Sequence, residues 1–354
     1  MQQSLQNLIS KIKKAKKSKL PFVIYRSPNK IVVKAFVQKN STLYYQSASE
    51  KAGFVFAPFK NSEKTVIFPL QKCEGFTASI EEGFISQLLG NPAKIEKEER
   101  LGKQEYLTLI KKSIQFLDIK KASKVVLSRK EKIALGDKNI YEIYVDLLYK
   151  YPSAFVYLWY HPKVGLWMGA SPETLLKVKN NNFETMALAG TQVYKGSLNV
   201  VWENKEIQEQ QFVTDYILSQ LKDEMLVIGS PFTLKAGSLL HLCTKISGTL
   251  KHESQLETLV KILHPTPAVC GLPKKEAKIF ILENENYNRE YYTGYLGELR
   301  VNNQTNLFVN LRCMQIKNSK AHLYIGGGIT NKSVPEKEWE ETVVKSKIMK
   351  CVLT

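Results

Sequence analysis

The chain has 354 residues, of which 44% are hydrophobic, and this is enough for a sizeable globular core. Its formal net charge of +18 is compatible with a nucleic acid, a membrane surface or an anionic small molecule as partner. The longest apolar-aromatic stretch, residues 151–160, is far shorter than the roughly 20 residues of a membrane-spanning helix, so no membrane span is expected.

Residues 1–20 predict a short amphipathic helix, with Leu5, Leu8, Ile9 and Ile12 on one face beside a run of lysines. No apolar signal core follows this run, which favours a cytoplasmic protein. We interpret the helix as a solvated basic cap on the fold, and docking to a membrane or a nucleic acid is the alternative.

From residue 21 to about 85, short apolar runs separated by turn-forming residues predict strands. A charged stretch, residues 94–103, then opens a helical region that extends to about 122. We place a weak boundary between two parts of the chain in this charged stretch. Residues 1–100 are expected to form a variable N-terminal part packed into the same globule, and residues 101–354 carry the candidate functional residues.

The remainder alternates between helical and strand-like patterns. Two strands joined by the turn Asn180–Asn182 indicate a hairpin in a meandering antiparallel sheet. Two further strands are expected at 307–317 and 321–329. Helices are expected at about 139–150, 204–225, 253–263, 272–281 and 335–350. The predicted fold class is α+β.

The five cysteines are odd in number, widely spaced and without a CxxC pair. This pattern argues against a disulfide framework and a zinc site, so we expect reduced, mostly buried thiols. They are Cys73, Cys243, Cys270, Cys313 and Cys351.

Two expected helices carry paired carboxylates. Glu206 and Glu209 lie three residues apart on the first, and Glu338 and Glu341 repeat this spacing on the last, with Lys345 on the same stripe. Each pair alone is typical of an exposed acidic first turn. Two pairs that meet across a cleft would fit Mg²⁺, which prefers oxygen ligands.

The last helix also carries a predicted start signal, because Ser333 and Glu336 flank Pro335 in the spacing of a capping box. Shortly before it, residues 324–329 run from a strand into three glycines, where bare backbone N–H groups can approach an anion. A tight turn without a ligand is the alternative. The segment lacks the P-loop and GxGxxG patterns, which argues against nucleotide binding.

Three other residues are candidates on weaker grounds. Lys124 starts a strand and would be a base if it faced the interior, although a strand-edge lysine is usually solvated. Glu173 follows Ser171 and Pro172 in a turn, where carboxylates are usually exposed. His241 is more often a satisfied core histidine than a catalytic one.

Taken in order, ten segments of residues 105–350 resemble the chorismate-utilising enzymes, which include isochorismate, salicylate, anthranilate and aminodeoxychorismate synthases. The resemblance implies large antiparallel sheets packed together with helices on the outside. The segments are KVVLSR, GASPETLL, MALAGT, NKEIQEQQFV, LHLCTKISG, HPTPAVCG, REYYTGYLGEL, LFVNLRCMQI, IGGGIT and PEKEWEETVVKSKIM.

Carried over position by position, the resemblance implies that Glu209 and Glu341 bind Mg²⁺, that Glu206 and Glu338 lie nearby, and that the metal holds the ring carboxylate of chorismate. The other implied contacts fall into three groups. Tyr292, Arg312, Gly327 and Gly328 would hold the enolpyruvyl carboxylate, Gly190, Thr191 and Lys345 would complete the pocket, and His241 would lie near the ring.

The resemblance also implies the roles of Lys124 and Glu173. Family members that use water carry a lysine in this motif, so Lys124 would deprotonate water attacking C2, and Glu173 would protonate the hydroxyl leaving from C4. Such chemistry needs a neutral amine and a carboxylic acid that stays protonated near pH 7, and burial favours both forms. The implied product is isochorismate, for menaquinone or siderophore synthesis.

Two positions separate the branches of the family. Salicylate synthases, which go on to eliminate pyruvate, usually carry threonine where this chain has Ala268 in the substrate pocket. Ammonia-dependent relatives usually carry PIAGT or PIKGT where this chain has ALAGT at 187–191. Both positions favour isochorismate synthase, and salicylate synthase is the alternative.

Two other classes of protein are disfavoured. Outside residues 11–19 the positive charge is dispersed and no recognition motif occurs, which argues against a nucleic-acid-binding module. An inactive relative is disfavoured because Lys124, Glu173, Glu209 and Glu341 are all present. We expect a monomer whose partner is chorismate, a dianion that suits the positive surface.

Overall fold

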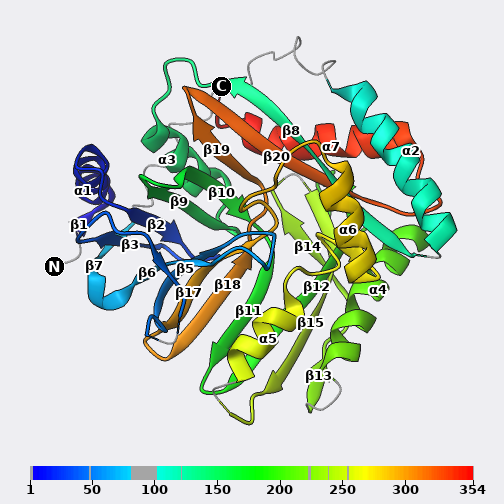
Figure 1. Ribbon diagram of the computed structural model, residues 1–354, viewed down its shortest axis with the longest axis horizontal. Coiled ribbons are helices and arrows are strands. Elements are labelled where there is room, and N and C mark those ends of the chain that lie inside the picture. Colours follow the sequence, from blue (N-terminus) through cyan, green and yellow to red (C-terminus); the bar gives the residue numbers. More distant parts are fainter. Residues whose placement is uncertain are drawn as a thin grey trace.

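The computed structural model describes residues 3–47, 49–80, 102–120, 122–221, 225–237, 239–252 and 255–353. Most of the charged stretch 94–103, and with it the expected boundary, lies outside these residues. The described chain forms two large sheets with helices on their outer faces, which confirms the α+β class (Figure 1).

The first sheet combines N-terminal strands with strands from the middle and end of the chain. All of its pairings are antiparallel except that of β1 with β7. In spatial order its described strands are β1 (Gln3–Ser4), β7 (Cys73–Ser79), β3 (Val32–Gln38), β2 (Phe22–Arg26), β9 (Phe155–His161), β10 (Gly165–Ser171), β19 (Cys313–Lys317), β20 (Lys320–Ile329), β8 (Lys124–Ala134) and β16 (Gly271–Leu272).

The second sheet is antiparallel along its described strands and also mixes N-terminal with later segments. In spatial order these strands are β13 (Leu226–Ile228), β15 (Leu239–Thr249), β12 (Asn182–Val193), β11 (Thr174–Lys179), β18 (Gln304–Val309), β17 (Tyr295–Val301), β5 (Gly53–Ala57), β6 (Val66–Pro69) and β4 (Tyr44–Tyr45), and β14 (Phe232–Ala236) pairs with β15.

The helices are α1 (Leu5–Lys17), α2 (Lys103–Lys120), α3 (Ile140–Lys150), α4 (Asn204–Gln220), α5 (Gln255–Leu263), α6 (Lys274–Asn284) and α7 (Pro335–Lys350), with a 3₁₀ turn at Leu70–Lys72. Within the described residues none of them has the length and apolar content to span a membrane. Helix α7 has the predicted bounds, but its capping differs from the prediction. Val334 is its N-cap and makes no side-chain cap, while the Ser333 hydroxyl accepts from the Thr330 N–H (3.1 Å) instead.

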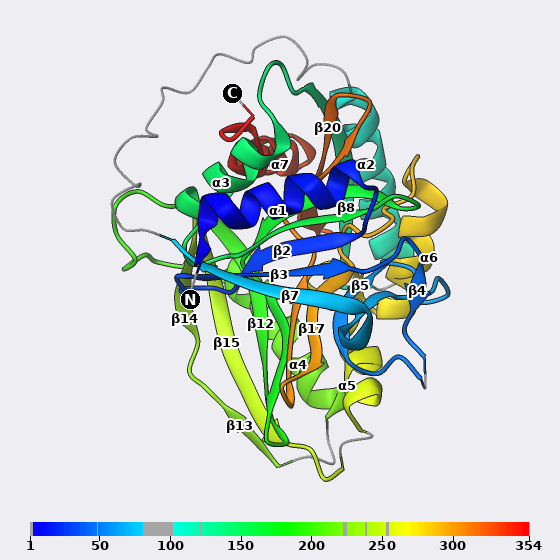
Figure 2. The same cartoon turned by 90° about the vertical axis from the view of Figure 1, so that its left-hand side faces the viewer.

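Four clusters of apolar side chains hold the described elements together, and one of them packs α2 and α6 against β8. Aromatic residues such as Phe56, Phe155 and Trp159 fill the space between the sheets. The outer face of the first sheet is covered by α1, α3 and α7, and Figure 2 shows α1 lying across β2 and β3. Helices α4 and α5 cover the outer face of the second sheet. The N-terminal helix is thus a cap on the fold, as interpreted from its amphipathic pattern.

The structure confirms two local predictions, the hairpin turn and the free thiols. The β11–β12 hairpin turns at Asn180 and Asn181, both with positive φ (50° and 65°), as asparagine in a two-residue turn allows. The five cysteines are free thiols, and Cys243, Cys270 and Cys313 are buried.

Two adjacent chain segments pass from one sheet to the other. The step from β10 to β11 crosses at Pro172 and Glu173, and the step from β18 to β19 crosses at residues 310–312. The crossings lie side by side, because β10 pairs with β19 and β11 with β18. The single strand expected at 307–317 is therefore wrong. Arg312, with a φ of 45°, breaks it between two sheets.

Candidate active site

One cavity at these crossings gathers most of the predicted site residues. Its volume is about 80 Å³, which is small for a ligand site. Among the predicted residues, Gly327, Glu206 and Glu338 do not line it. Those that line it are Lys124, Glu173, Gly190, Thr191, Glu209, His241, Ala268, Tyr292, Arg312, Gly328, Glu341 and Lys345.

Lys124, at the start of β8, points into the protein rather than to solvent, and is only 3% exposed. Its ammonium nitrogen lies 3.8 Å from Glu209 Oε2. Gly328 on the neighbouring strand makes room for it, because a Cβ there would lie 2.6 Å from Lys124 Cε. The three-glycine segment is therefore a packing requirement as well as a stretch of accessible backbone.

The glycines belong to β20 and do not form the tight turn considered as the alternative. Pairing of β20 with β19 ends at Tyr324, whereas pairing with β8 continues to Ile329. The edge of β20 beyond Tyr324 therefore faces the cavity, where Lys345 Nζ donates to Gly326 O (3.1 Å).

Glu173 is 2% exposed and does not behave as an ordinary turn carboxylate. Burial raises its pKa to about 7, and Thr266, Lys124 and Arg312 offset part of this rise. Thr266 Oγ1 donates to Glu173 Oε1 (3.3 Å), and Val309 N donates to the Glu173 carbonyl (3.0 Å). The crossing backbone thus holds a carboxyl group that is substantially protonated near neutral pH.

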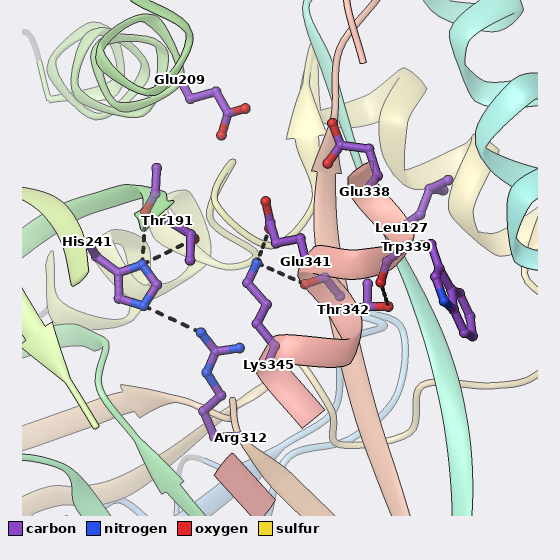
Figure 3. A network of polar contacts seen from close by, with 12 residues as sticks. Leu127, Thr191, Glu209, His241, Arg312, Glu338, Trp339, Glu341, Thr342 and Lys345 are labelled. Carbon is purple, nitrogen blue, oxygen red and sulfur yellow. Dashed lines mark hydrogen bonds and ion pairs between the residues drawn. The ribbon is translucent and has the colours of Figure 1, made fainter. Parts of the chain in front are cut away.

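His241, on β15, is a neutral imidazole held in one tautomer. Burial and, secondarily, the charge of Arg312 lower its pKa to about 3. Nδ1 lies 2.9 Å from Gly190 O and donates to it, so Nε2 is free to accept from Arg312 Nη2 at 3.4 Å (Figure 3). His241 therefore orients the guanidinium of Arg312 without adding a charge.

Arg312 is a partly buried cation without a carboxylate in ion-pair contact among the described residues. Within the same residues its Nε has no hydrogen-bond partner. Burial accordingly lowers its pKa. The charges of Glu341 and Glu173 act on it from a distance, but no carboxylate is in direct contact, so the guanidinium is available to bind an external carboxylate.

Three carboxylates gather near the other end of the cavity, and two of them, Glu209 and Glu341, line it. Glu209 comes from α4, and Glu338 and Glu341 come from the first turns of α7 (Figure 3). Burial and the neighbouring Glu341 raise the pKa of Glu338. Burial alone would raise the pKa of Glu341 as well, but Lys345, Lys205 and Arg312 reverse the shift and lower it.

This group fits a hard divalent cation. Lys205 Nζ lies 2.9 Å from Glu338 Oε1 and 4.0 Å from Glu209 Oε1, so a positive charge already sits between the two helices. Among the described residues no three His, Cys, Asp or Glu side chains form a ready metal cluster. Mg²⁺ needs only one or two protein carboxylates, since waters and an anionic substrate supply its other ligands.

Glu206 packs against Gly190, which lines the cavity, but does not line the cavity itself. Its Oε2 accepts from Glu203 N (2.9 Å) and so closes the N-terminus of its own helix. Of the two carboxylates of α4, Glu206 is therefore engaged in helix capping, whereas Glu209 lines the cavity.

The sequence analysis missed a buried ion pair behind the cavity. Arg289 Nε donates to Glu285 Oε2 (2.8 Å), and both side chains are almost fully buried. Arg289 also donates to Val126 O (2.7 Å) and Val269 O (3.0 Å), which ties β8 to the segment that carries Ala268. Arg289 opens the quoted segment REYYTGYLGEL, and its four-residue separation from Glu285, the C-cap of α6, is a sequence signal that could have suggested the pair.

The family model of the chorismate binding enzymes matches residues 49–354. The chain therefore belongs to the chorismate binding enzyme family.

Two curated relatives are isochorismate synthases. EntC of Escherichia coli (strain K12) is 31% identical over 196 residues, which are 52% of this chain and 50% of the relative. MenF of Bacillus subtilis (strain 168) is 28% identical over 270 residues, which are 73% and 57% of the two chains. The matches thus span about half the length of these relatives.

The fold is shared with solved structures of the same family. The menaquinone-specific isochorismate synthase MenF of Escherichia coli superposes with a TM-score of 0.75 at 20% identity, over 94% of this chain and 89% of that one. Anthranilate synthase component I of Streptococcus pneumoniae gives 0.67 at 19% identity, over 93% and 90%. At such identities the likeness shows the fold.

Proposed function

We propose that the protein converts chorismate to isochorismate with the help of Mg²⁺. The observation that carries this proposal is the meeting of Lys124 and Glu173 in one buried cavity beside Arg312, a cation without a counter-ion. The names of the relatives, isochorismate synthases for the most part, support the same substrate and product.

The two charged ends of the cavity suit the two carboxylates of chorismate. Arg312, oriented by His241, would bind the enolpyruvyl carboxylate together with Tyr292 and the open edge of β20. The carboxylate group at Glu209 and Glu341 would hold Mg²⁺, which would accept the ring carboxylate. Because the cavity measures only about 80 Å³, the side chains at its mouth must move aside for a ring of this size.

The reaction needs one proton removed and one supplied. Lys124 would take a proton from the water that forms the new C2–O bond. The two ring double bonds then shift by one position and the C4–O bond breaks. Glu173 would give its proton to the departing hydroxyl, which leaves as water, so that substrate and product are isomers. Mg²⁺, when bound, would withdraw electron density from the ring carboxylate and stabilise charge that develops on the ring.

The test is to incubate the purified protein with chorismate and Mg²⁺, without ammonia, and to separate the products by chromatography. We expect isochorismate to accumulate, and its formation to stop with EDTA. Salicylate with pyruvate would assign the chain to the salicylate branch, and a product that forms only with ammonium would assign it to the anthranilate branch.

Two variants test the catalytic roles in this assay, and a third is the control. Lys124→Gln and Glu173→Gln should each lower kcat by about 10²-fold or more. Lys132→Gln, at an exposed position of the same strand β8, should retain full turnover. Turnover that survives in both Lys124→Gln and Glu173→Gln would contradict the proposed roles.

A further inference from the structure

A second cavity lies away from the site described above. It has a volume of about 440 Å³, within the usual range for small-molecule sites, compared with about 80 Å³ for the catalytic cavity. It lies on the outer face of the second sheet, between α5, the strands β5, β17 and β18, and the loop 58–65 that joins β5 to β6.

The floor of this cavity is apolar. Val55 and Leu299 rise from the sheet, and Leu256 and Val260 descend from α5. Tyr295 adds an aromatic wall, and its ring meets that of His264 edge-on with 5.0 Å between the centroids. Such a floor suits a flat apolar body, because an aromatic ligand gains both burial and edge contacts there.

The rim is positively charged. Lys51, Lys64 and Lys261 line it and are exposed, and within the described chain Lys51 and Lys261 form no ion pair. The acidic residues of the rim are already matched. Glu257 Oε1 lies 2.6 Å from Arg300 Nη1, and Glu63 Oε1 lies 3.9 Å from Lys60 Nζ. Because positive charge is in excess at the rim, the ligand should carry an anionic group in addition to its apolar ring system.

One chain segment links the two cavities, because His264 lines this cavity and Ala268 lines the catalytic cavity. His264 Nε2 contacts Pro58 O (3.1 Å), and Asn61 Nδ2 donates to His264 O (3.3 Å), so the loop 58–65 fixes His264. Two residues further on, Thr266 donates to Glu173. His264 and Thr266 are only two positions apart in the chain. A ligand that displaces the loop 58–65 would therefore also shift Thr266 and alter its hydrogen bond to Glu173.

We propose that this cavity binds a small aromatic carboxylate, and that its occupancy changes turnover through the segment from His264 to Thr266. The ring system would lie on the floor formed by Val55, Val260 and Tyr295, and the carboxylate would face Lys51 and Lys261. The effect on turnover rests on the proposed conversion of chorismate, whereas the binding itself does not.

Binding is tested by isothermal titration calorimetry with 2-naphthoate as the probe and neutral 2-naphthamide as its matched analogue. The intact protein should bind 2-naphthoate more tightly than the amide. In the double variant Lys51→Glu with Lys261→Glu, affinity for 2-naphthoate should fall by about fivefold or more. The control with equal net charge is Lys111→Glu with Lys132→Glu, two exposed lysines elsewhere, and it should bind normally.

The outcomes separate the two parts of the proposal. Failure of 2-naphthoate to bind, or equal binding by both double variants, overturns the site, and the second result would point to the catalytic cavity instead. In the assay with chorismate, 2-naphthoate should change kcat with little change in KM, and the Lys51→Glu, Lys261→Glu variant should lose this response. Binding at the site with an unchanged kcat overturns the coupling.

Discussion

At the residue scale, two side chains gain their properties from where the chain crosses between sheets. Glu173 and Arg312 sit at adjacent crossings between the two sheets, where Glu173 is buried and Arg312 is partly buried. In solution one would be an ordinary anion and the other a solvated cation. Here the carboxyl group is held near its protonated form and the guanidinium lacks a counter-ion, so the pair can act on an anionic substrate.

The pH dependence of turnover should report on Glu173. An acid catalyst is active while protonated, and the pKa of Glu173 is raised to about 7. We therefore expect kcat to fall by about tenfold per pH unit above pH 7, as the proton is lost. The measurement is kcat at saturating chorismate and Mg²⁺ from pH 5.5 to about 9. A descending limb that persists unchanged in Glu173→Gln would assign it to another group.

Adjacent glycines provide a matched pair of substitutions. A Cβ at Gly328 would lie 2.6 Å from Lys124 Cε, whereas a Cβ at Gly327 would meet its nearest neighbour, Glu341 Oε1, at 3.7 Å. Gly328→Ala should therefore displace Lys124 and lower kcat by about 10²-fold, because a small misplacement of a catalytic group is costly. Gly327→Ala should change kcat little. Steady-state kinetics on both variants, with thermal unfolding as the folding control, checks this, and equal losses would refute the packing argument.

At the element scale, local patterns predicted most helices and the hairpin correctly, because periodicity and turn residues are local. The bounds of α7 and the start of β8 at Lys124 were among these. The break at Arg312 could not be seen, since an apolar run has the same pattern in one sheet as across two. The Glu285–Arg289 pair was missed for a related reason. Its contribution to stability depends on burial by β8 and the segment 266–270, which are distant in the sequence.

Helix α4 carries two glutamates that should respond differently to Mg²⁺. Glu209 faces Lys124 and the carboxylates of α7, whereas Glu206 caps its own helix. Glu209→Gln should raise the Mg²⁺ concentration needed for half-maximal turnover by about tenfold or more. Glu206→Gln should leave this concentration unchanged and cost about 1 kcal/mol of unfolding free energy at most. Mg²⁺ titrations of turnover, with urea unfolding, distinguish the two, and a large Mg²⁺ effect in Glu206→Gln would return it to the metal site.

Helix α6 ends in the buried pair that joins β8 to the Ala268 segment. Glu285→Gln would leave the Arg289 charge buried without compensation, at a cost of about 3–5 kcal/mol. Glu283→Gln, exposed near the end of the same helix, should stay within about 0.5 kcal/mol of the parent protein. Urea unfolding measures both values. Equal stabilities would show that water or a neighbouring group compensates Arg289.

At the scale of the whole molecule, the two sheets explain why the site could be only partly assembled from the sequence. Residues from β8, β12, β15, β20, α4 and α7 meet at the crossings, and the ordered segments of the family were needed to list them together. The charge of the molecule was read directly from composition. The molecule carries a net charge of +18, and Arg312 lines its catalytic cavity.

This positive charge should affect substrate capture, measured by kcat/KM, rather than the chemical step, measured by kcat. Chorismate is a dianion, so a positive surface raises its concentration near the cavity, and salt screens that attraction over about 10 Å at 0.1 M. We expect kcat/KM to fall severalfold from low salt to about 0.5 M NaCl, while kcat at saturating chorismate and Mg²⁺ changes by less than about twofold. Repeating the series with KCl separates screening from a specific ion effect. A constant kcat/KM would show that the surface charge serves another purpose, and a parallel fall in kcat would place the effect of salt on the buried site itself.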